Sequence, residues 1–169
     1  MTDTAIALGN RTLSVDDVAA IAAGANIRLD PDPTYRARID RGAAFVERLL
    51  AETGEIYGIT TGYGDSCSVG VPLDLAKELP IHLMRYHGCG LGKHFTPEET
   101  RAVLAARLAS LSLGYSGVRC LLLDRIAALI NHDLMPLMPE EGSVGASGDL
   151  TPLSYLAAVL MGERMVWRQ

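Results

Sequence analysis

Apolar residues recur at helical spacing along most of this chain, three and four residues apart. They are mostly Ala and Leu, and the 169 residues include only two Phe, one Trp and six Tyr. This composition favours helices over a β-sandwich, so we predict a mainly α-helical fold with one short strand at residues 5–10. The predicted helices span residues 15–23, 34–52, 97–113, 118–131 and 150–162.

Two of these helices have clear start signals. Ser14 is placed as an N-cap before residues 15–23, and the acidic Asp16 and Asp17 suit the positive end of the helix dipole. Thr96 is followed by Pro97 at the first helical position and then by two glutamates, the pattern of a capped start.

Charge and hydropathy exclude two classes of partner. Lys and Arg number 15 against 20 Asp and Glu, a net charge of −5, and no basic stripe is visible, so we expect no nucleic-acid partner. The longest apolar stretch, residues 153–161, is shorter than the about 20 residues that a membrane span requires, so we expect no membrane association.

The cysteines indicate a reducing compartment. Cys67, Cys89 and Cys120 are an odd set without a Cys-x-x-Cys pair, which predicts free thiols that serve as small core residues. Residues 1–10 do not have the pattern of a signal peptide, so we expect a cytoplasmic protein.

Two glycine-rich stretches interrupt the helical pattern, residues 57–64 (Tyr-Gly-Ile-Thr-Thr-Gly-Tyr-Gly) and 142–149 (Gly-Ser-Val-Gly-Ala-Ser-Gly-Asp). Such conflict with regular structure is common at functional sites. Three interpretations of the second stretch are open. A phosphate loop would need Lys where Asp149 stands, and a nucleophile elbow would need one more residue after Ser147. A glycine-rich turn leading into a helix needs neither.

The tripeptide Ala146-Ser147-Gly148 permits a fourth interpretation. Attack of the Gly148 amide nitrogen on the Ala146 carbonyl carbon would close a five-membered ring. Loss of two water molecules, one of them from the Ser147 side chain, would leave an exocyclic alkene. Glycine lets the nitrogen approach, and the positive end of the following helix would make the alkene more electrophilic.

Residues 142–153 (Gly-Ser-Val-Gly-Ala-Ser-Gly-Asp-Leu-Thr-Pro-Leu) resemble the signature of the aromatic amino acid ammonia-lyases and aminomutases, the family of histidine, phenylalanine and tyrosine lyases. Residues 57–64 and 114–119 (Gly-Tyr-Ser-Gly-Val-Arg) are similar to two further blocks of that family, in the same order. The resemblance implies the helical N-terminal domain of the ammonia-lyase (fumarase/aspartase-like) fold, with a short N-terminal strand and glycine-rich active-site loops.

The resemblance also implies the chemistry. In the family, the tripeptide that matches Ala146, Ser147 and Gly148 cyclises autocatalytically to a methylidene-imidazolone (MIO) group, and no metal or nucleotide is used. The position of Tyr57 belongs to the base that removes a proton from the β-carbon of the substrate. Elimination then yields ammonia and an α,β-unsaturated acid.

Three further positions match substrate-binding residues. Gly64 corresponds to a glycine that lines the pocket, and His87 with Gly88 to the position that selects the substrate. A histidine there can hydrogen-bond a phenol or an imidazole, which favours tyrosine or histidine over phenylalanine. Thr60 and Tyr63 depart from the Asn and Phe that are usual in histidine lyases. The spacing of His82, His87, Cys89 and His94 is not that of a zinc site.

The resemblance implies that residues 1–169 are the N-terminal, MIO-bearing domain of a longer protein. Members are homotetramers of several hundred residues whose active sites combine subunits, so we expect a homo-oligomer and no lyase activity from this segment alone. The same residues would serve a tyrosine 2,3-aminomutase. A non-catalytic helical interaction module is the alternative of another class.

Overall fold

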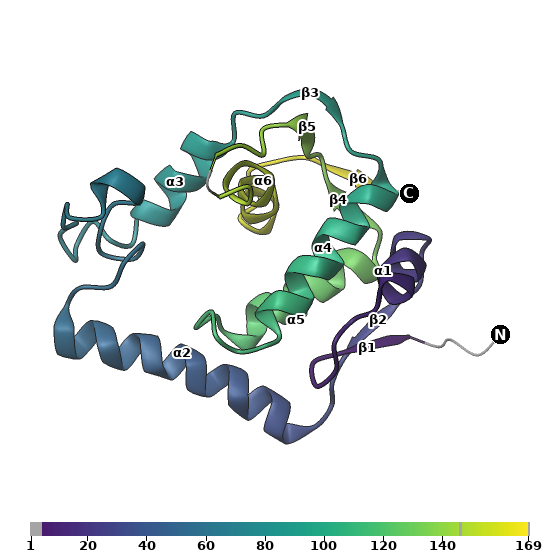
Figure 1. The fold of residues 1–169 in the computed structure, drawn as a ribbon, viewed down its shortest axis with the longest axis horizontal. Helices are drawn as coiled ribbons and strands as arrows, with labels where there is room; N and C mark the ends of the chain where they lie inside the picture. The colour runs from purple at the N-terminus through teal and green to yellow at the C-terminus, as the bar shows by residue number, and fades with distance from the viewer. Residues whose placement is uncertain (1–4, 146, 169) are drawn as a thin grey trace.

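The computed structural model describes residues 5–145 and 147–168, and its order of elements confirms a mainly α-helical fold (Figure 1). The predicted strand and all five predicted helices are present, with ends shifted by a few residues. The helices are α1 (Val15–Ala22), α2 (Pro33–Thr53), α3 (Leu79–His87), α4 (Pro97–Leu111), α5 (Cys120–Asn131) and α6 (Leu150–Leu160). The strands are β1 (Ile6–Leu8), β2 (Ile27–Leu29), β3 (Leu91–His94), β4 (Leu134–Pro136), β5 (Pro139–Glu141) and β6 (Val166–Arg168), and a 3₁₀ turn covers Gly64–Ser66.

Helix α4 lies at the centre of the core. It packs against α1 and α5, and α2 runs along the outside of the molecule (Figure 1). Leu104 and Leu108 of α4 are fully buried together with Leu123, Ile126 and Ile130 of α5. Burial of these side chains stabilises the packing of the two helices.

Both predicted helix starts are confirmed, and each is a complete capping box. The Ser14 hydroxyl accepts from the Asp17 amide at 3.1 Å, and the Asp17 carboxylate accepts from the Ser14 amide at 2.8 Å. Thr96 and Glu99 exchange the same two bonds at 3.2 and 2.8 Å. Each pair satisfies amides that a helix start otherwise leaves without partners.

Three two-stranded sheets connect the helices. β1 pairs with β2 in parallel, whereas the β3–β5 and β4–β6 pairs are antiparallel. Only β1 was predicted, from its apolar run before a turn, because the other strands contain a charged residue or a proline that breaks such a run. No helix in the described part of the chain is long and apolar enough to cross a bilayer.

Helix α3 and the positions of the cysteines differ from the sequence predictions. α3 was not predicted because its start lacks a capping residue: Glu78 stands at the N-cap and makes no side-chain capping bond. The prediction that the cysteines are core residues is wrong for Cys67 and Cys89, which are exposed, whereas Cys120 is half-buried and packs against the core. Cys67 and Cys89 follow the 3₁₀ turn and α3, outside the packed helices.

A buried arginine joins three helices. Arg101 on α4 is only 4% exposed and donates to the carbonyls of Ile21, in the last turn of α1, and Ala25, after it, at 2.7 and 2.9 Å. It also donates to the Ile130 carbonyl of α5 at 2.6 Å and pairs with the carboxylate of Asp133. A cation is favourable here because the C-terminal ends of α1 and α5 carry the negative ends of their dipoles.

We expect Arg101→Met to lower the free energy of unfolding by about 3 kcal/mol, because buried carbonyls and the Asp133 carboxylate lose their donor. Urea unfolding followed by circular dichroism measures the change. The matched control is Arg125→Met, since Arg125 is an exposed arginine on α5, and it should change stability by less than about 0.5 kcal/mol. Equal effects of the two substitutions would contradict this role.

Candidate active site

The first glycine-rich loop follows α2 and is held by its own hydrogen bonds. Thr60 and Thr61 are buried, and their hydroxyls accept from the amides of Ile56 and Gly58 at 2.8 and 3.1 Å. Val71 donates back to the Thr60 carbonyl at 2.7 Å. Thr60, which departs from the histidine-lyase pattern, and its neighbour Thr61 therefore build the turn itself.

Tyr57 lies at the surface of this loop with its side chain 65% exposed. Its phenol oxygen accepts a hydrogen bond from the Gly64 amide at 3.2 Å, and its ring meets Tyr63 edge-on, 6.3 Å between centroids. Burial raises the pKa of the Tyr63 phenol, which donates to the Gly58 carbonyl at 2.9 Å. Of the two phenols, only that of Tyr57 is open to a ligand.

Gly64 has a φ of 55°, a left-handed conformation that favours glycine, and an added Cβ there would meet no atom within 4 Å. The two predicted residues Tyr57 and Gly64 are thus brought together by one hydrogen bond. The prediction that Gly64 lines a substrate pocket stays a prediction.

The second glycine-rich loop runs from β5 to α6 and is tightly closed. Glu141 pairs with Leu91 of β3, and a Cβ added at Gly142 would lie 2.5 Å from Thr151 Cγ2. A Cβ added at Gly148 would lie 2.8 Å from the Ser143 hydroxyl. Both ends of the loop therefore fold against each other. Ser147 and Gly148 are exposed, and Ala146 lies outside the described residues.

Helix α6 begins directly after this loop. Asp149 is its N-cap residue but makes no side-chain capping bond, so the amides of the first turn point towards the loop without that partner. Tyr155 and Leu156, in the middle of α6, are buried in the core. The helix thereby aims its positive end at the tripeptide.

A cavity of about 350 Å³ lies beside the start of α6, between α3 and α4. Its polar lining comes from His87, Arg107, Asp149 and Ser154. The Nδ1 of His87 is 2.9 Å from the carbonyl of Leu83. Because a carbonyl can only accept, Nδ1 carries the proton and Nε2 of the neutral ring is an acceptor.

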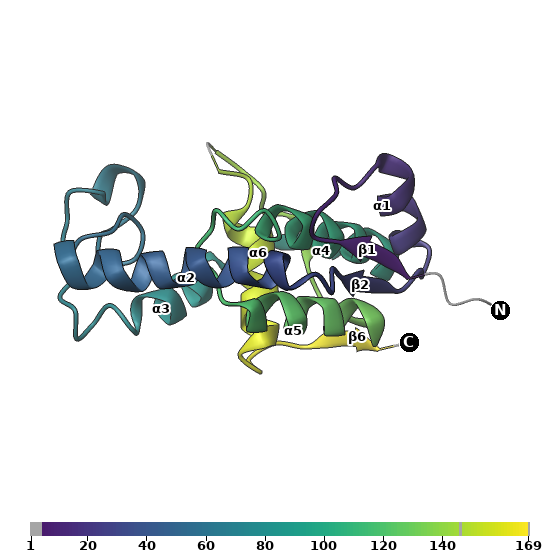
Figure 2. The same cartoon turned by 90° about the horizontal axis from the view of Figure 1, so that it is seen from below.

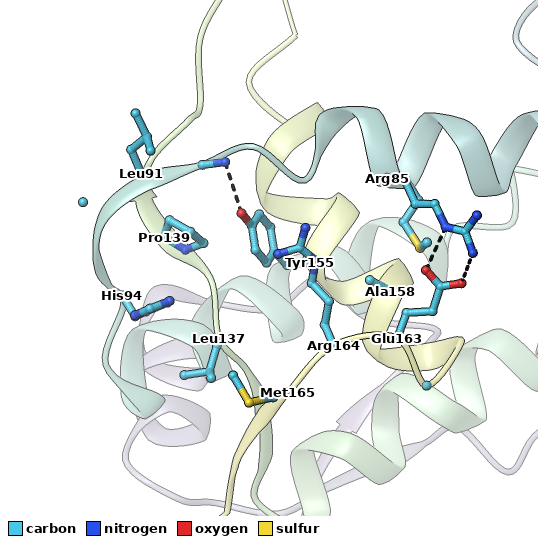
Figure 3. Close-up of a pocket in the computed structure, with 14 residues that line it drawn as sticks. Arg85, Leu91, His94, Leu137, Pro139, Tyr155, Ala158, Glu163, Arg164 and Met165 are labelled. Atoms are coloured by element: carbon cyan, nitrogen blue, oxygen red, sulfur yellow. Dashed lines mark hydrogen bonds and ion pairs between the residues drawn. The ribbon is translucent and has the colours of Figure 1, made fainter.

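A second cavity, of about 880 Å³, lies on another side of α6 (Figure 3). Its charged groups are already paired, since Arg85 binds Glu163 at 2.7 Å and Arg164 lies over the Tyr155 ring. Arg164 also donates to the Gly88 carbonyl at 2.7 Å and occupies the space of a Cβ at that residue. Gly88 therefore contacts Arg164, and its role in substrate binding stays a prediction.

The structure does not bring the two glycine-rich loops together. In both overall views the loop after α2 and the loop before α6 project from separate parts of the chain (Figures 1 and 2). His87, on α3, shares a cavity with Asp149, whereas Tyr57 and Gly64 bond within their own loop. Among the described residues, no group of three or more His, Cys, Asp or Glu side chains is placed to hold a metal ion.

The contact between Arg107 and Asp149 was not predicted from the sequence. Asp149 was noted only as a residue that disfavours a phosphate loop. The ion pair between the two is 3.8 Å long and joins residues on different helices, so no local pattern could have predicted it. A charged residue directly after the tripeptide was the one available signal.

The family profile described as aromatic amino acid lyase matches residues 13–169. The chain belongs to this family, which confirms the resemblance seen in its motifs. Histidine ammonia-lyase from Bos taurus is 37% identical over 162 residues, 96% of this chain and 24% of the relative.

Solved structures of aminomutases and ammonia-lyases are also similar to this chain. The tyrosine aminomutase from Streptomyces globisporus is 34% identical with a TM-score of 0.88 and covers 98% of this chain and 31% of that one. Histidine ammonia-lyase from Trypanosoma cruzi is 30% identical with a TM-score of 0.83 at 98% and 31% coverage. The chain thus spans about a quarter of the length of the curated relatives and about a third of these two structures.

The closed loop before α6 predicts a specific sensitivity. Gly142→Ala forces a methyl group against Thr151 and the Gly90 backbone, so we expect the free energy of unfolding to fall by about 1–3 kcal/mol. At Gly70 an added Cβ meets no atom within 4 Å, so Gly70→Ala is the matched control and should stay within about 0.5 kcal/mol. Thermal unfolding of both variants measures the difference, and an equal response would contradict the packing of this loop.

Proposed function

We propose that this chain is the MIO-bearing part of an enzyme that eliminates ammonia from an aromatic L-amino acid, with tyrosine or histidine preferred over phenylalanine. The observation that carries the proposal is the Ala-Ser-Gly tripeptide in a closed loop at the start of α6, in a chain of the aromatic amino acid lyase family. Membership in a family whose named relatives are ammonia-lyases favours this function over a non-catalytic module.

The residues around the tripeptide fit the formation of an MIO group. Gly148 lies so close to the Ser143 hydroxyl that a side chain would collide with it, which supports a compressed loop. Ser147 is the residue of the tripeptide with a leaving group on its β-carbon. Once formed, the group supplies an electrophilic alkene for the substrate amine, and the positive end of α6 favours negative charge there.

Tyr57 is proposed as the base that takes the proton from the substrate β-carbon. Its exposed phenol oxygen already receives the Gly64 amide proton at 3.2 Å, a bond that stabilises negative charge on that oxygen. Tyr57 lies away from the tripeptide of its own chain. In an oligomer, a Tyr57 from one subunit can serve the tripeptide of another, which is why we propose a homo-oligomeric enzyme.

His87 supports the substrate preference. The bond from Nδ1 to the Leu83 carbonyl leaves Nε2 as an acceptor, on a residue that lines a cavity next to the start of α6. A phenol hydroxyl or an imidazole N–H can donate to it, whereas a phenyl ring cannot. A buried acceptor without a donor would penalise phenylalanine.

A tyrosine aminomutase is the second candidate, because the Streptomyces globisporus enzyme of that name has a TM-score of 0.88 to this chain. In that reaction ammonia returns at the β-carbon. The products separate the two candidates, since a lyase releases an α,β-unsaturated acid and ammonia, and a mutase releases a β-amino acid.

Intact mass and turnover test the proposal in the full product of the gene. We expect a mass two water molecules below that of the encoded chain. Ser147→Ala should abolish this loss and reduce turnover by about a thousandfold or more, as for other groups that act covalently. Ser143→Ala, which removes a hydroxyl outside the tripeptide, should keep the mass loss. Full turnover by Ser147→Ala would refute the proposal.

Substitution of His87 tests the substrate preference. His87→Phe removes the acceptor and adds apolar surface, so kcat/KM for tyrosine or histidine relative to phenylalanine should fall by about tenfold or more. Steady-state kinetics with the three amino acids measures the ratio, and thermal unfolding shows whether the variant remains folded. An unchanged ratio in a folded variant would exclude His87 as the selecting residue.

A further inference from the structure

The turn between α3 and β3 directly follows His87, the residue proposed to select the substrate. Two side chains that are distant in sequence bind the backbone of this turn. The guanidinium of Arg164 donates to the Gly88 carbonyl at 2.7 Å. The phenol oxygen of Tyr155 accepts from the Gly90 amide at 3.1 Å. Both ends of the turn are therefore held by α6 and the segment that follows α6.

Arg164 and Tyr155 also contact each other. The guanidinium carbon of Arg164 lies 4.2 Å from the centre of the Tyr155 ring, within the range of a cation–π contact (Figure 3). Tyr155 is only 4% exposed and comes from the middle of α6, so its ring is a fixed support for the guanidinium. One buried side chain thus binds the turn and also orients the second side chain that binds it.

The backbone that carries Arg164 is fixed on both sides. α6 ends in a Schellman motif, in which Gly162, at a φ of 77°, donates to the Val159 carbonyl at 3.0 Å. In the same motif, Glu163 donates to the Ala158 carbonyl at 2.9 Å. β6 begins two residues after Arg164 and pairs with β4. The position of Arg164 is therefore set by the reversal before it and by the strand after it.

Arg164 lies at the C-terminal end of α3, where a cation is favourable. Gly88 is the C-cap residue of α3, and the last carbonyls of a helix carry the negative end of its dipole. A Cβ added at Gly88 would collide with the guanidinium, so glycine leaves room for this contact. His87 is the last residue of α3, and its Nδ1 is bonded to the Leu83 carbonyl one turn earlier. Fraying of this turn would break that bond and move Nε2.

We infer that Arg164 is a positioning residue for substrate selection and that it acts through His87. By capping α3 and stacking on Tyr155, it holds the last turn of the helix. In that geometry Nδ1 of His87 donates to Leu83, and Nε2 remains an acceptor for a substrate phenol or imidazole. This inference rests on the proposed function, because it concerns how the same site distinguishes its substrates.

Removal of the Arg164 side chain should loosen the end of α3 and leave the fold intact. Arg164 is an exposed residue that lines the cavity of about 880 Å³, outside the packed core. α3 also packs on α6 directly, and the buried ring of Tyr155 remains when Arg164 is truncated. The substrate ratio should therefore respond more strongly than the thermal stability.

Selectivity of the full product of the gene tests the inference. Arg164→Met keeps a long unbranched side chain but cannot donate. The ratio of kcat/KM for tyrosine or histidine to that for phenylalanine should then fall about threefold to tenfold, the effect of about one hydrogen bond. Arg164→Lys, which keeps the charge and a donor, should recover part of the ratio. The matched control is Arg36→Met, which removes the exposed ion pair of Arg36 with Asp124 and should leave the ratio unchanged.

A double substitution shows whether Arg164 acts through His87. In a His87→Phe background the selecting acceptor is already absent, so adding Arg164→Met should not change the ratio further. A general loss of folding would instead lower turnover of all three amino acids together. Circular dichroism and thermal unfolding accompany each variant. If Arg164→Met does not fold, Tyr155→Phe removes only the hydroxyl that binds Gly90 and should lower the ratio in the same direction.

The outcomes separate this inference from the proposed function. An unchanged ratio in a folded Arg164→Met variant, or in Tyr155→Phe where that variant replaces it, would overturn the role of Arg164 and leave the proposed function intact. An equal change in the ratio with and without His87 would overturn it as well. If the unsubstituted full product releases neither an α,β-unsaturated acid nor a β-amino acid from any of the three substrates, the proposed function fails and this inference fails with it.

Discussion

The guanidinium of Arg101 is the interaction on which this domain most depends. It enters the core between the C-terminal ends of α1 and α5 and replaces the solvent that their last carbonyls would otherwise require. The Asp133 carboxylate compensates its charge from the surface side. Asp133 takes a positive φ of 53°, the conformation of a residue that ends a helix, and this turns its side chain back towards Arg101. The three helices are thereby held in one arrangement, because moving any of them leaves a buried charge or carbonyl without its partner.

Helix α4, which Arg101 holds in place, also contacts the candidate site. Arg101 lies in the first half of the helix, in the core, and Arg107 lies near the other end, beside the start of α6. One helix therefore connects the most buried cation of the domain to the loop that carries the tripeptide. The loop itself is exposed and held by a few close contacts. A rigid support beneath an exposed loop is the arrangement that an autocatalytic ring closure requires, since the reacting atoms must be brought close without side chains in the way.

The parts of the fold that could be predicted have local causes. The starts of α1 and α4 follow from Ser14 and Thr96, whose capping boxes act within four residues. Helix α3 has no such cap, and β3 pairs with β5 across a stretch of sequence that contains α4 and α5. The exposed positions of Cys67 and Cys89 were not predicted, because the local sequence around a cysteine near a turn does not show whether other elements pack over it.

By itself, the sequence determined the class of the fold, the family and the tripeptide, because helical spacing, capping residues and the order of three motifs are properties of neighbouring residues. Only the tertiary structure decided which side chains meet. It placed His87 beside Asp149, left Tyr57 on a separate loop, buried Arg101 and paired Arg107 with Asp149. Those pairings join residues on different helices, and they depend on how the helices pack, which local sequence does not encode.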